Sequence, residues 1–258
     1  MLKHKYISIL IVTVLVSLFV LGFYFEVRPW IFVAVLFTWL VFTTWGSFDI
    51  RINYFVRAYS GNPKEKERKI AITFDDGPHE MTPQVLDLLQ RFNVKATFFC
   101  IGSQIEQHPE IFRRILAEGH VAGNHTYSHS KSFGFFSAEK ITQEINQTNA
   151  IAENLSGKKN LLFRPPFGVT TPNLRKAIRQ TKQSVIGWNI RSLDTVTEDE
   201  NQVFERIRKR IVPGGIILLH DTSLKTVHVL ERLLLHLKSE NYEVVTVTEL
   251  LNIPAYES

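Results

Sequence analysis

The chain has 258 residues, of which 45% are apolar, and a formal net charge of +5 at pH 7. This composition excludes a disordered chain, and so small a basic excess does not by itself indicate a nucleic-acid-binding protein. A single cysteine, Cys100, excludes an intramolecular disulfide.

The first sixty residues differ in composition from the rest of the chain. Residues 6–25 and 30–48 are two uncharged, apolar runs joined by a short turn. Each is close to the ~20 residues that a helix needs to cross a bilayer. A cleaved signal peptide fits poorly, because the first run is long and a second follows at once. We therefore predict a transmembrane helical hairpin in residues 1–48, with the lipid bilayer as a partner.

The distribution of Lys and Arg predicts the orientation of this multi-pass membrane protein. A hairpin places the N-terminus and everything after residue 48 on the same side of the membrane. Only Arg28 lies in the turn, whereas basic residues flank the outer ends of both runs. The positive-inside rule therefore favours the cytoplasmic face for the large domain, with an extracytoplasmic domain as the alternative. The flanking basic residues are Lys3, Lys5, Arg51, Arg57, Lys64, Lys66, Arg68 and Lys69.

We predict a juxtamembrane linker in residues 49–66, in which 50–56 could form an interfacial helix, and one domain in residues 67–258. In this domain strand-like segments alternate with helix-like ones, which indicates a parallel sheet, either doubly wound or closed as a barrel. The predicted strands are 69–74, 96–101, 120–124, 161–164, 184–188, 215–219 and 243–247. The predicted helices are 82–92, 109–118, 137–155, 172–181, 198–211 and 226–240.

Two adjacent carboxylates, Asp75 and Asp76, follow the apolar start of the first of these strands. Neighbouring side chains of a strand point to opposite faces, so two Asp in a row would not share a cavity. Gly77 can adopt backbone angles that other residues avoid, and Pro78 fixes its own φ. We expect this Gly-Pro pair to end the strand and to turn both carboxylates toward one rim.

The second polar motif is His125-Thr126-Tyr127-Ser128-His129. Two His at i and i+4 project the same way from a helical turn, which is a spacing that suits a shared metal ion. One Asp and two His would make a three-ligand set with open positions, as in catalytic zinc sites. The remaining Asp would then be free to act as a base.

Reactive residues follow several other predicted strands as well. Arg164 ends the fourth strand, Asp194 follows the fifth, and His220 with Asp221 ends the sixth. Polar residues gathered after the carboxyl ends of many strands are typical of βα barrels, whereas an open sheet concentrates them at one switch point.

Five segments resemble the signatures of the polysaccharide deacetylases of the NodB-homology group, carbohydrate esterase family four. The resemblance covers residues 67–251 and implies an α/β fold with a distorted (β/α)7 barrel, preceded here by the two-helix transmembrane hairpin. The fourth segment departs most, because Arg191 stands at the family's first Asp and Thr195 at its last Trp. The segments are Thr73-Phe74-Asp75-Asp76-Gly77-Pro78, His125 to His129, Arg164-Pro165-Pro166-Phe167-Gly168, Trp188 to Thr195, and Ile217-Leu218-Leu219-His220-Asp221.

The resemblance also implies a role for each motif residue. Asp76, His125 and His129 would bind a divalent metal, for which zinc is expected and Co2+, Ni2+ and other divalent ions are alternatives. Asp75 would be the catalytic base and His220 the catalytic acid. The backbone N–H of Phe167 would bind the oxyanion. Arg164, Pro165, Trp188 and Leu218 would shape the substrate site, and Asp194 would support it by pairing with either Arg164 or His220.

The function implied is that of a metal-dependent hydrolase acting on non-peptide C–N bonds. It would remove N-acetyl groups from the amino sugars of a polysaccharide or of a lipid-linked glycan. The alternative is a catalytically silent, membrane-tethered member of the same fold that binds glycan. Nucleic acid is not an expected partner, because acidic residues dilute the basic patch of 198–211.

Overall fold

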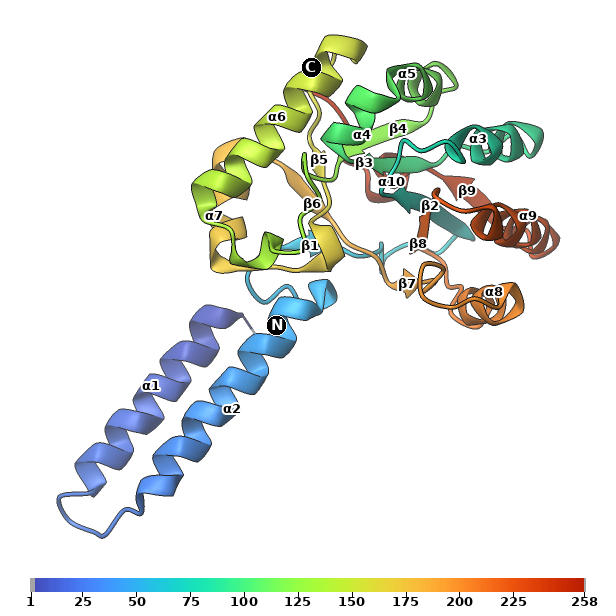
Figure 1. Ribbon diagram of the computed structural model, residues 1–258. Coiled ribbons are helices and arrows are strands. Elements are labelled where there is room, and N and C mark those ends of the chain that lie inside the picture. The colour runs from blue at the N-terminus through green and yellow to red at the C-terminus, as the bar shows by residue number, and fades with distance from the viewer. Residues whose placement is uncertain (1–2, 258) are drawn as a thin grey trace.

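The computed structural model describes residues 3–257 and contains a helical hairpin attached to an α/β domain (Figure 1). Residues 1 and 2 of the predicted hairpin and residue 258 of the predicted domain lie outside the described part. The hairpin consists of α1 (His4–Leu21) and α2 (Pro29–Phe48). Both helices are long and apolar enough to cross a membrane. Large apolar side chains are exposed along both of them.

The α/β domain is built on a parallel sheet that curls into a half-barrel with helices outside it (Figure 1), which confirms the predicted fold class. Strands lie side by side in the order β1-β6-β5-β4-β3-β2-β8-β7, and β9 also pairs with β2. The register aligns Asp75 with both Phe99 and His220. The strands are β1 (Ala58–Tyr59), β2 (Lys69–Asp75), β3 (Thr97–Cys100), β4 (Val121–Asn124), β5 (Leu162–Phe163), β6 (Ser184–Ile186), β7 (Ile190–Arg191), β8 (Gly215–His220) and β9 (Glu243–Val245).

Every predicted strand and helix of this domain is present, with ends that differ by at most three residues. Four short elements were not predicted from the sequence: β1, β7, α4 and α10. The helices are α3 (Thr82–Arg91), α4 (Gly102–Gln107), α5 (Pro109–Ala117), α6 (Ala138–Ser156), α7 (Pro172–Thr181), α8 (Glu200–Arg208), α9 (Leu224–Ser239) and α10 (Val247–Leu251).

The segment expected to form an interfacial helix is instead part of the barrel. It contains one 3-10 turn (Ile50–Ile52), after which Tyr54, Phe55 and Val56 are buried in an apolar cluster with side chains of α6 and α7. The chain then forms β1, which pairs in parallel with β6. Aromatic and β-branched residues favour such a buried, extended conformation, so residues 54–58 pack on the domain, whereas residues 63, 64 and 66 are exposed.

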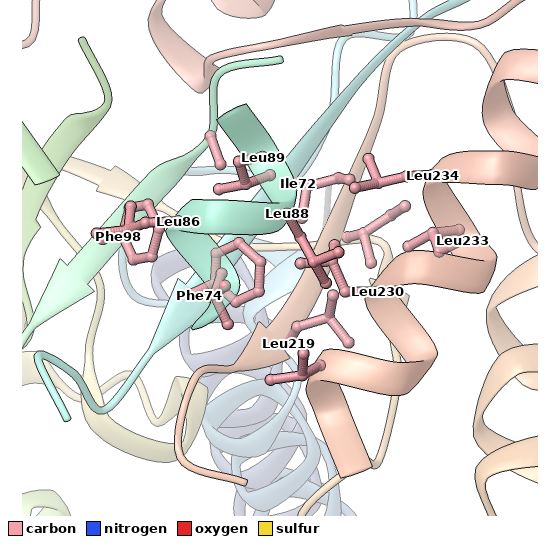
Figure 2. Packing of buried hydrophobic residues seen from close by; sticks show 14 of the residues in the cluster. Ile72, Phe74, Leu86, Leu88, Leu89, Phe98, Leu219, Leu230, Leu233 and Leu234 are labelled. Carbon is pink, nitrogen blue, oxygen red and sulfur yellow. The ribbon is translucent and has the colours of Figure 1, made fainter. Parts of the chain in front are cut away.

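The main apolar core lies between the sheet and the helices α3 and α9 (Figure 2). Phe74 and Phe98 stack at 5.0 Å between ring centroids. Leu219 of β8 and Leu230 and Leu233 of α9 are fully buried beside them. This core holds β2 and β8 in register, and both strands end at the polar rim described below.

Helix α9 offers a matched pair of substitutions that tests this packing. Leu233 is 0% exposed and Leu235 is 54% exposed on the same helix. We expect Leu233→Ala to lower the free energy of unfolding by about 2–5 kcal/mol, because it leaves a cavity in a close-packed core. Leu235→Ala should change it by no more than about 0.5 kcal/mol. Thermal unfolding of the full chain in detergent measures both. Equal melting temperatures for the two variants would contradict the packing.

Candidate metal and catalytic site

The first motif ends β2 and turns through a left-handed residue. That residue is Asp76, with φ 75°, rather than Gly77 as predicted. Gly77 serves a different purpose, because a Cβ there would lie 2.4 Å from Asp221 Oδ2. Burial raises the pKa of Asp221 to about 7, and its Oδ2 accepts a 2.5 Å hydrogen bond from the Thr82 hydroxyl. The absence of a side chain at position 77 therefore lets the loop pack against this buried carboxyl group.

The segment from His125 to His129 is an irregular loop and not the predicted helical turn. Thr126 and His129 have φ values of 66° and 44°. Glu144 of α6 is buried, and its Oε2 accepts hydrogen bonds of 2.8–3.1 Å from two backbone N–H groups and one hydroxyl of the loop. The sequence analysis missed this residue. Its signal was an acidic side chain at helical spacing from the apolar Ile141 and Ile145 of the same helix face.

Asp76, His125 and His129 lie together at the carboxyl ends of the strands. Asp76 Oδ1 is 3.5 Å from His125 Nε2 and 3.3 Å from His129 Nε2. The three ligand atoms all lie within 4.8 Å of one another. Within residues 3–257, the buried Oδ1 has no hydrogen-bond partner. An unpaired buried carboxylate oxygen facing two imidazole nitrogens fits a divalent cation such as zinc.

The tautomer of His125 also fits this role. Its Nδ1 lies 2.7 Å from the backbone carbonyl oxygen of Arg164. A carbonyl oxygen only accepts, so Nδ1 must donate, and in the neutral ring Nε2 keeps its lone pair toward Asp76. A hydrogen bond at the far nitrogen is the usual way in which proteins orient a metal-binding imidazole.

His129 and Asp76 have the protonation states that metal ligands require. Burial lowers the pKa of His129 to about 4, and the neighbouring His125 lowers it further, so the ring is neutral at pH 7. Burial alone would raise the pKa of Asp76. Contact with the His125 imidazole, together with the nearby rings of His129 and His220, outweighs burial and holds that pKa below its usual range. A neutral imidazole and an ionised carboxylate are the forms that bind a cation.

Asp75 is paired with Arg164, and both side chains are buried. Arg164 Nη1 lies 2.6 Å from Asp75 Oδ1 and 2.8 Å from the Thr73 hydroxyl. Two other nitrogens of the guanidinium donate to backbone carbonyls of residues 186 and 187. Asp75 Oδ2 is 3.7 Å from His125 Nε2. One oxygen of Asp75 is therefore held by the guanidinium, and the other faces the Asp/His/His cluster.

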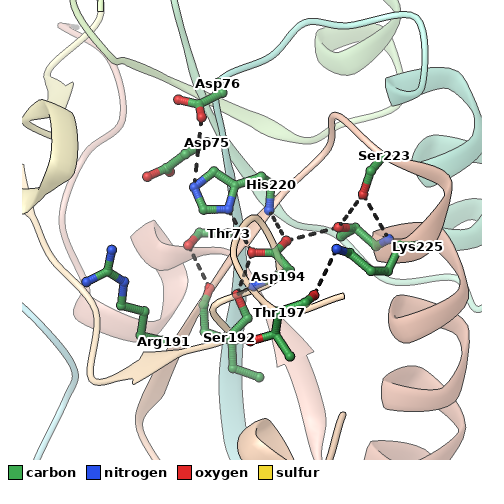
Figure 3. A network of polar contacts seen from close by, with 12 residues as sticks. Thr73, Asp75, Asp76, Arg191, Ser192, Asp194, Thr197, His220, Ser223 and Lys225 are labelled. Carbon is green, nitrogen blue, oxygen red and sulfur yellow. Dashed lines mark hydrogen bonds and ion pairs between the residues drawn. The ribbon is translucent and has the colours of Figure 1, made fainter. Parts of the chain in front are cut away.

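Arg191, which departs from the family signature, takes no part in this pair. It lies on β7 with its guanidinium 5.9 Å from the Trp188 ring, and Figure 3 shows it apart from the network around His220. Arg164 contacts Asp75 directly, so the pair forms without an acidic residue at position 191.

Asp194 pairs with His220, which decides between its two predicted partners. Asp194 Oδ1 lies 2.8 Å from His220 Nδ1, and Oδ2 accepts a 2.8 Å hydrogen bond from the His220 backbone N–H (Figure 3). Ser192 and Thr226 donate hydroxyl hydrogen bonds to the same carboxylate. Burial alone would lower the pKa of His220, but Asp194 outweighs it and the pKa rises to about 9. His220 Nε2 faces Asp76 Oδ2 at 3.9 Å.

The loop after β5 brings Phe167 to the same rim. Phe167 has φ 59°, and its ring lies 4.8 Å from that of His129. It follows Pro165 and precedes Gly168, at which a Cβ would lie 2.6 Å from the Trp188 ring. Gly168 thus permits close packing of the loop on an indole.

Trp188 and Leu218 belong to one buried apolar cluster below the rim. Leu218 is two residues before His220 on β8, so the two side chains point to the same face of the sheet. The structure therefore brings every predicted site residue to one end of the barrel.

Strained backbone also marks this end. Asp76, Thr126, His129 and Phe167 are non-glycine residues with left-handed φ values, and they come from three separate loops. Such conformations persist only where the surrounding structure imposes them, and they gather at functional sites. Here they aim the Asp/His/His cluster and one loop at a common point.

Comparisons with known proteins agree with this geometry. A family model described as polysaccharide deacetylase matches residues 62–186. The peptidoglycan-N-acetylglucosamine deacetylase of Bacillus cereus is 33% identical over 195 residues, which cover 74% of this chain and 70% of that protein. The peptidoglycan-N-acetylmuramic acid deacetylase PdaC of Bacillus subtilis is 34% identical over 194 residues, 73% of this chain but only 41% of that protein.

A solved structure is also similar. The Bc1960 peptidoglycan N-acetylglucosamine deacetylase, in complex with 4-naphthalen-1-yl-N-oxidanyl-benzamide, has a TM-score of 0.72 and 32% identity, covering 78% of this chain and 94% of that one. The likeness therefore extends over nearly the whole of that chain.

The geometry predicts that zinc stabilises the folded protein. Adding Zn2+ to metal-stripped full-length protein should raise its melting temperature, because a ligand of the native state stabilises it by about 2.7 kcal/mol at 100 times Kd. His125→Ala should lose most of this gain and the bound zinc, measured by thermal unfolding and elemental analysis. His228→Ala, at an exposed position on α9, should keep both. Equal zinc content in His125→Ala and wild type would exclude the site.

Proposed function

The chain belongs to the polysaccharide deacetylase family, the NodB-homology group of carbohydrate esterase family four, and from this premise we propose that it is a metal-dependent N-deacetylase. Its substrate would be an N-acetylated amino sugar in a polysaccharide or a lipid-linked glycan. One observation carries the proposal: an Asp/His/His cluster lies between a carboxylate held by Arg164 and an imidazole held by Asp194. The two similar Bacillus proteins described above are named as deacetylases of peptidoglycan amino sugars.

Asp76, His125 and His129 would hold the cation. Zinc fits two imidazoles and a carboxylate, and Co2+ or Ni2+ could replace it. When bound, the cation would polarise the acetamide carbonyl and lower the pKa of a water molecule to ~7.

Asp75 would act as the general base. A base must be ionised and within reach of the proton that it accepts. Arg164 occupies Oδ1 of Asp75 at 2.6 Å, whereas Oδ2 faces the cluster 3.7 Å from His125 Nε2. The guanidinium would thus fix the carboxylate and leave one oxygen free to take the proton of the attacking water.

His220 would act as the general acid. Its Nδ1 is bound by Asp194, which stabilises the imidazolium and directs Nε2 toward the cluster. The leaving amine of the sugar would receive the Nε2 proton as the C–N bond breaks, releasing acetate and a free amino sugar. Asp194 is a positioning residue in this scheme, because it acts through the imidazole and touches no reacting atom.

The loop after β5 would complete the site. The left-handed conformation of Phe167 would present its backbone N–H to the oxyanion, and one such donor typically contributes about 3 kcal/mol. Pro165 restricts the loop conformation. Trp188 and Leu218 would form the apolar wall beside the acetyl methyl group, since both lie in the cluster below the rim.

The substitution Asp75→Asn tests the proposed base independently of metal binding. We expect kcat for acetate release from chitotetraose to fall by about 10²–10⁴-fold, the usual contribution of a general base. The bound zinc should remain, because the amide still accepts a hydrogen bond from Arg164 and is not a predicted ligand. Acetate assays and elemental analysis of the same preparation measure the two effects. Unchanged kcat in this variant would refute the assigned base.

We further propose that residues 1–48 form a transmembrane hairpin and that 67–258 form the catalytic domain, joined by 49–66. Two facts support the hairpin: its helices match a bilayer in length, and many large apolar side chains are exposed along both of them. The basic residues at the domain end, compared with Arg28 alone at the turn, favour the cytoplasmic face for the domain.

Cysteine labelling tests this orientation with little background, since Cys100 is buried. We expect a membrane-impermeant maleimide to label Glu26→Cys, in the turn, in intact cells. Ser239→Cys, at the exposed end of α9, should react only after permeabilisation. The reverse pattern would place the catalytic domain outside the cytoplasm, and labelling of both positions in intact cells would exclude a hairpin.

A further inference from the structure

A largely apolar cavity of about 670 Å³ lies between the end of α2 and the mouth of the barrel. The hairpin forms one wall, and the loops beside the Asp/His/His cluster form the other. The lining residues include Thr43, Ser47 and Phe48 from α2, and Lys131, Phe135 and Phe167 from the barrel loops.

The aromatic side chains of this cavity face solvent to an unusual degree. Phe135 is 93% exposed, Phe48 68% and Phe167 48%. A soluble domain rarely exposes neighbouring aromatic rings around a hollow, and such a feature typically marks a binding site for an apolar ligand.

The two walls are fixed relative to each other. The hydroxyl of Ser47 donates to the Thr170 carbonyl at 2.7 Å, and the Thr170 N–H donates to the Ser47 carbonyl at 2.9 Å. One residue earlier, a Cβ at Gly46 would lie 2.3 Å from the Tyr54 ring, so α2 packs directly on the buried segment before β1. The hairpin is therefore attached to the loop that carries Phe167.

The cavity reaches from the end of a candidate membrane-spanning helix to the candidate catalytic centre. Phe48 is the last residue of α2, where a bilayer would end. The Phe167 ring is 4.8 Å from that of His129, one of the three proposed metal ligands. An apolar chain that leaves the bilayer along α2 would thus arrive beside the site of acetamide cleavage.

The charge of the cavity lining indicates which polar group is attached to the apolar ligand. Lys131 is the one charged residue in the lining, and its side chain is exposed. An exposed ammonium group in the lining of an apolar cavity suits the phosphate of an amphiphile. Lys131 lies two residues after the proposed ligand His129, so a phosphate bound to its ammonium group would lie near the proposed metal site.

We propose that the cavity binds the first part of the hydrocarbon chain of a lipid-linked amino sugar. Lys131 pairs with the phosphate that joins lipid to sugar, and the acetamide lies at Asp76, His125 and His129. This inference rests on the proposed deacetylase function and names its substrate class: a glycosyl phospholipid presented at the membrane surface, rather than a wall polymer.

The test compares two esters of N-acetylglucosaminyl phosphate that differ only in the alcohol, farnesyl or methyl. Full-length, zinc-loaded protein in nanodiscs is assayed for acetate release from each ester. We expect kcat/KM for the farnesyl ester to exceed that for the methyl ester by at least about tenfold, because apolar area is buried in the cavity.

Variants separate the cavity from simple partitioning of the farnesyl ester into the bilayer. Phe135→Ser should lower the farnesyl-to-methyl ratio by about tenfold, and Lys131→Gln should raise KM for the farnesyl ester. Leu235→Ser, which also removes an exposed apolar side chain, 54% exposed on α9, should keep the wild-type ratio. Phe135 is so exposed that its replacement should leave the fold intact.

Failure of the inference is distinguishable from failure of the proposed function. If wild type releases acetate from both esters but Phe135→Ser leaves their ratio unchanged, the cavity does not bind the lipid chain. Occupation by bilayer phospholipid or by a second copy of the chain would give this same result and overturn the inference. If neither ester nor chitotetraose releases acetate, the deacetylase function itself is wrong.

Discussion

The geometry of the site depends on one buried guanidinium. Arg164 is fully buried, and an unpaired charge there would be strongly destabilising. Its nitrogens bond to Asp75, to Thr73 and to two backbone carbonyls, so that the charge is compensated. Its own carbonyl accepts the Nδ1 proton of His125. One residue therefore fixes both the orientation of the proposed base and the tautomer of a proposed metal ligand.

The identities of the site residues could be predicted from the sequence, but their backbone geometry could not. Adjacent Asp at a strand end and two His four residues apart predict a metal site from residue types and spacing alone. The left-handed turn at Asp76 depends on the approach of Gly77 to Asp221, 144 residues later in the chain. The loop from His125 to His129 depends on Glu144. Local pattern carries no information on such tertiary contacts, so a helical turn was the wrong prediction there.

Tertiary contacts also explain why the chain can have Arg191 where the family signature has Asp. In this chain the buried Arg–Asp pair is closed by Thr73 and by carbonyls of residues 186 and 187, all supplied by the barrel itself. Each guanidinium nitrogen therefore has a hydrogen-bond partner without that carboxylate, and the proposed base retains its partner. Asp194, the acidic residue that remains in this segment, forms two hydrogen bonds with His220.

The attachment of the hairpin bears on where the chemistry can occur. A flexible tether would let the barrel search a volume of solvent, because its reach grows with linker length. Here β1 pairs with β6, and Ser47 and Thr170 exchange hydrogen bonds only three residues from Phe167. Movement of the rim away from the end of α2 would break these bonds and expose Tyr54, Phe55 and Val56. If α2 spans a bilayer, the proposed metal site is consequently held close to the membrane surface, and its substrate must come to that surface.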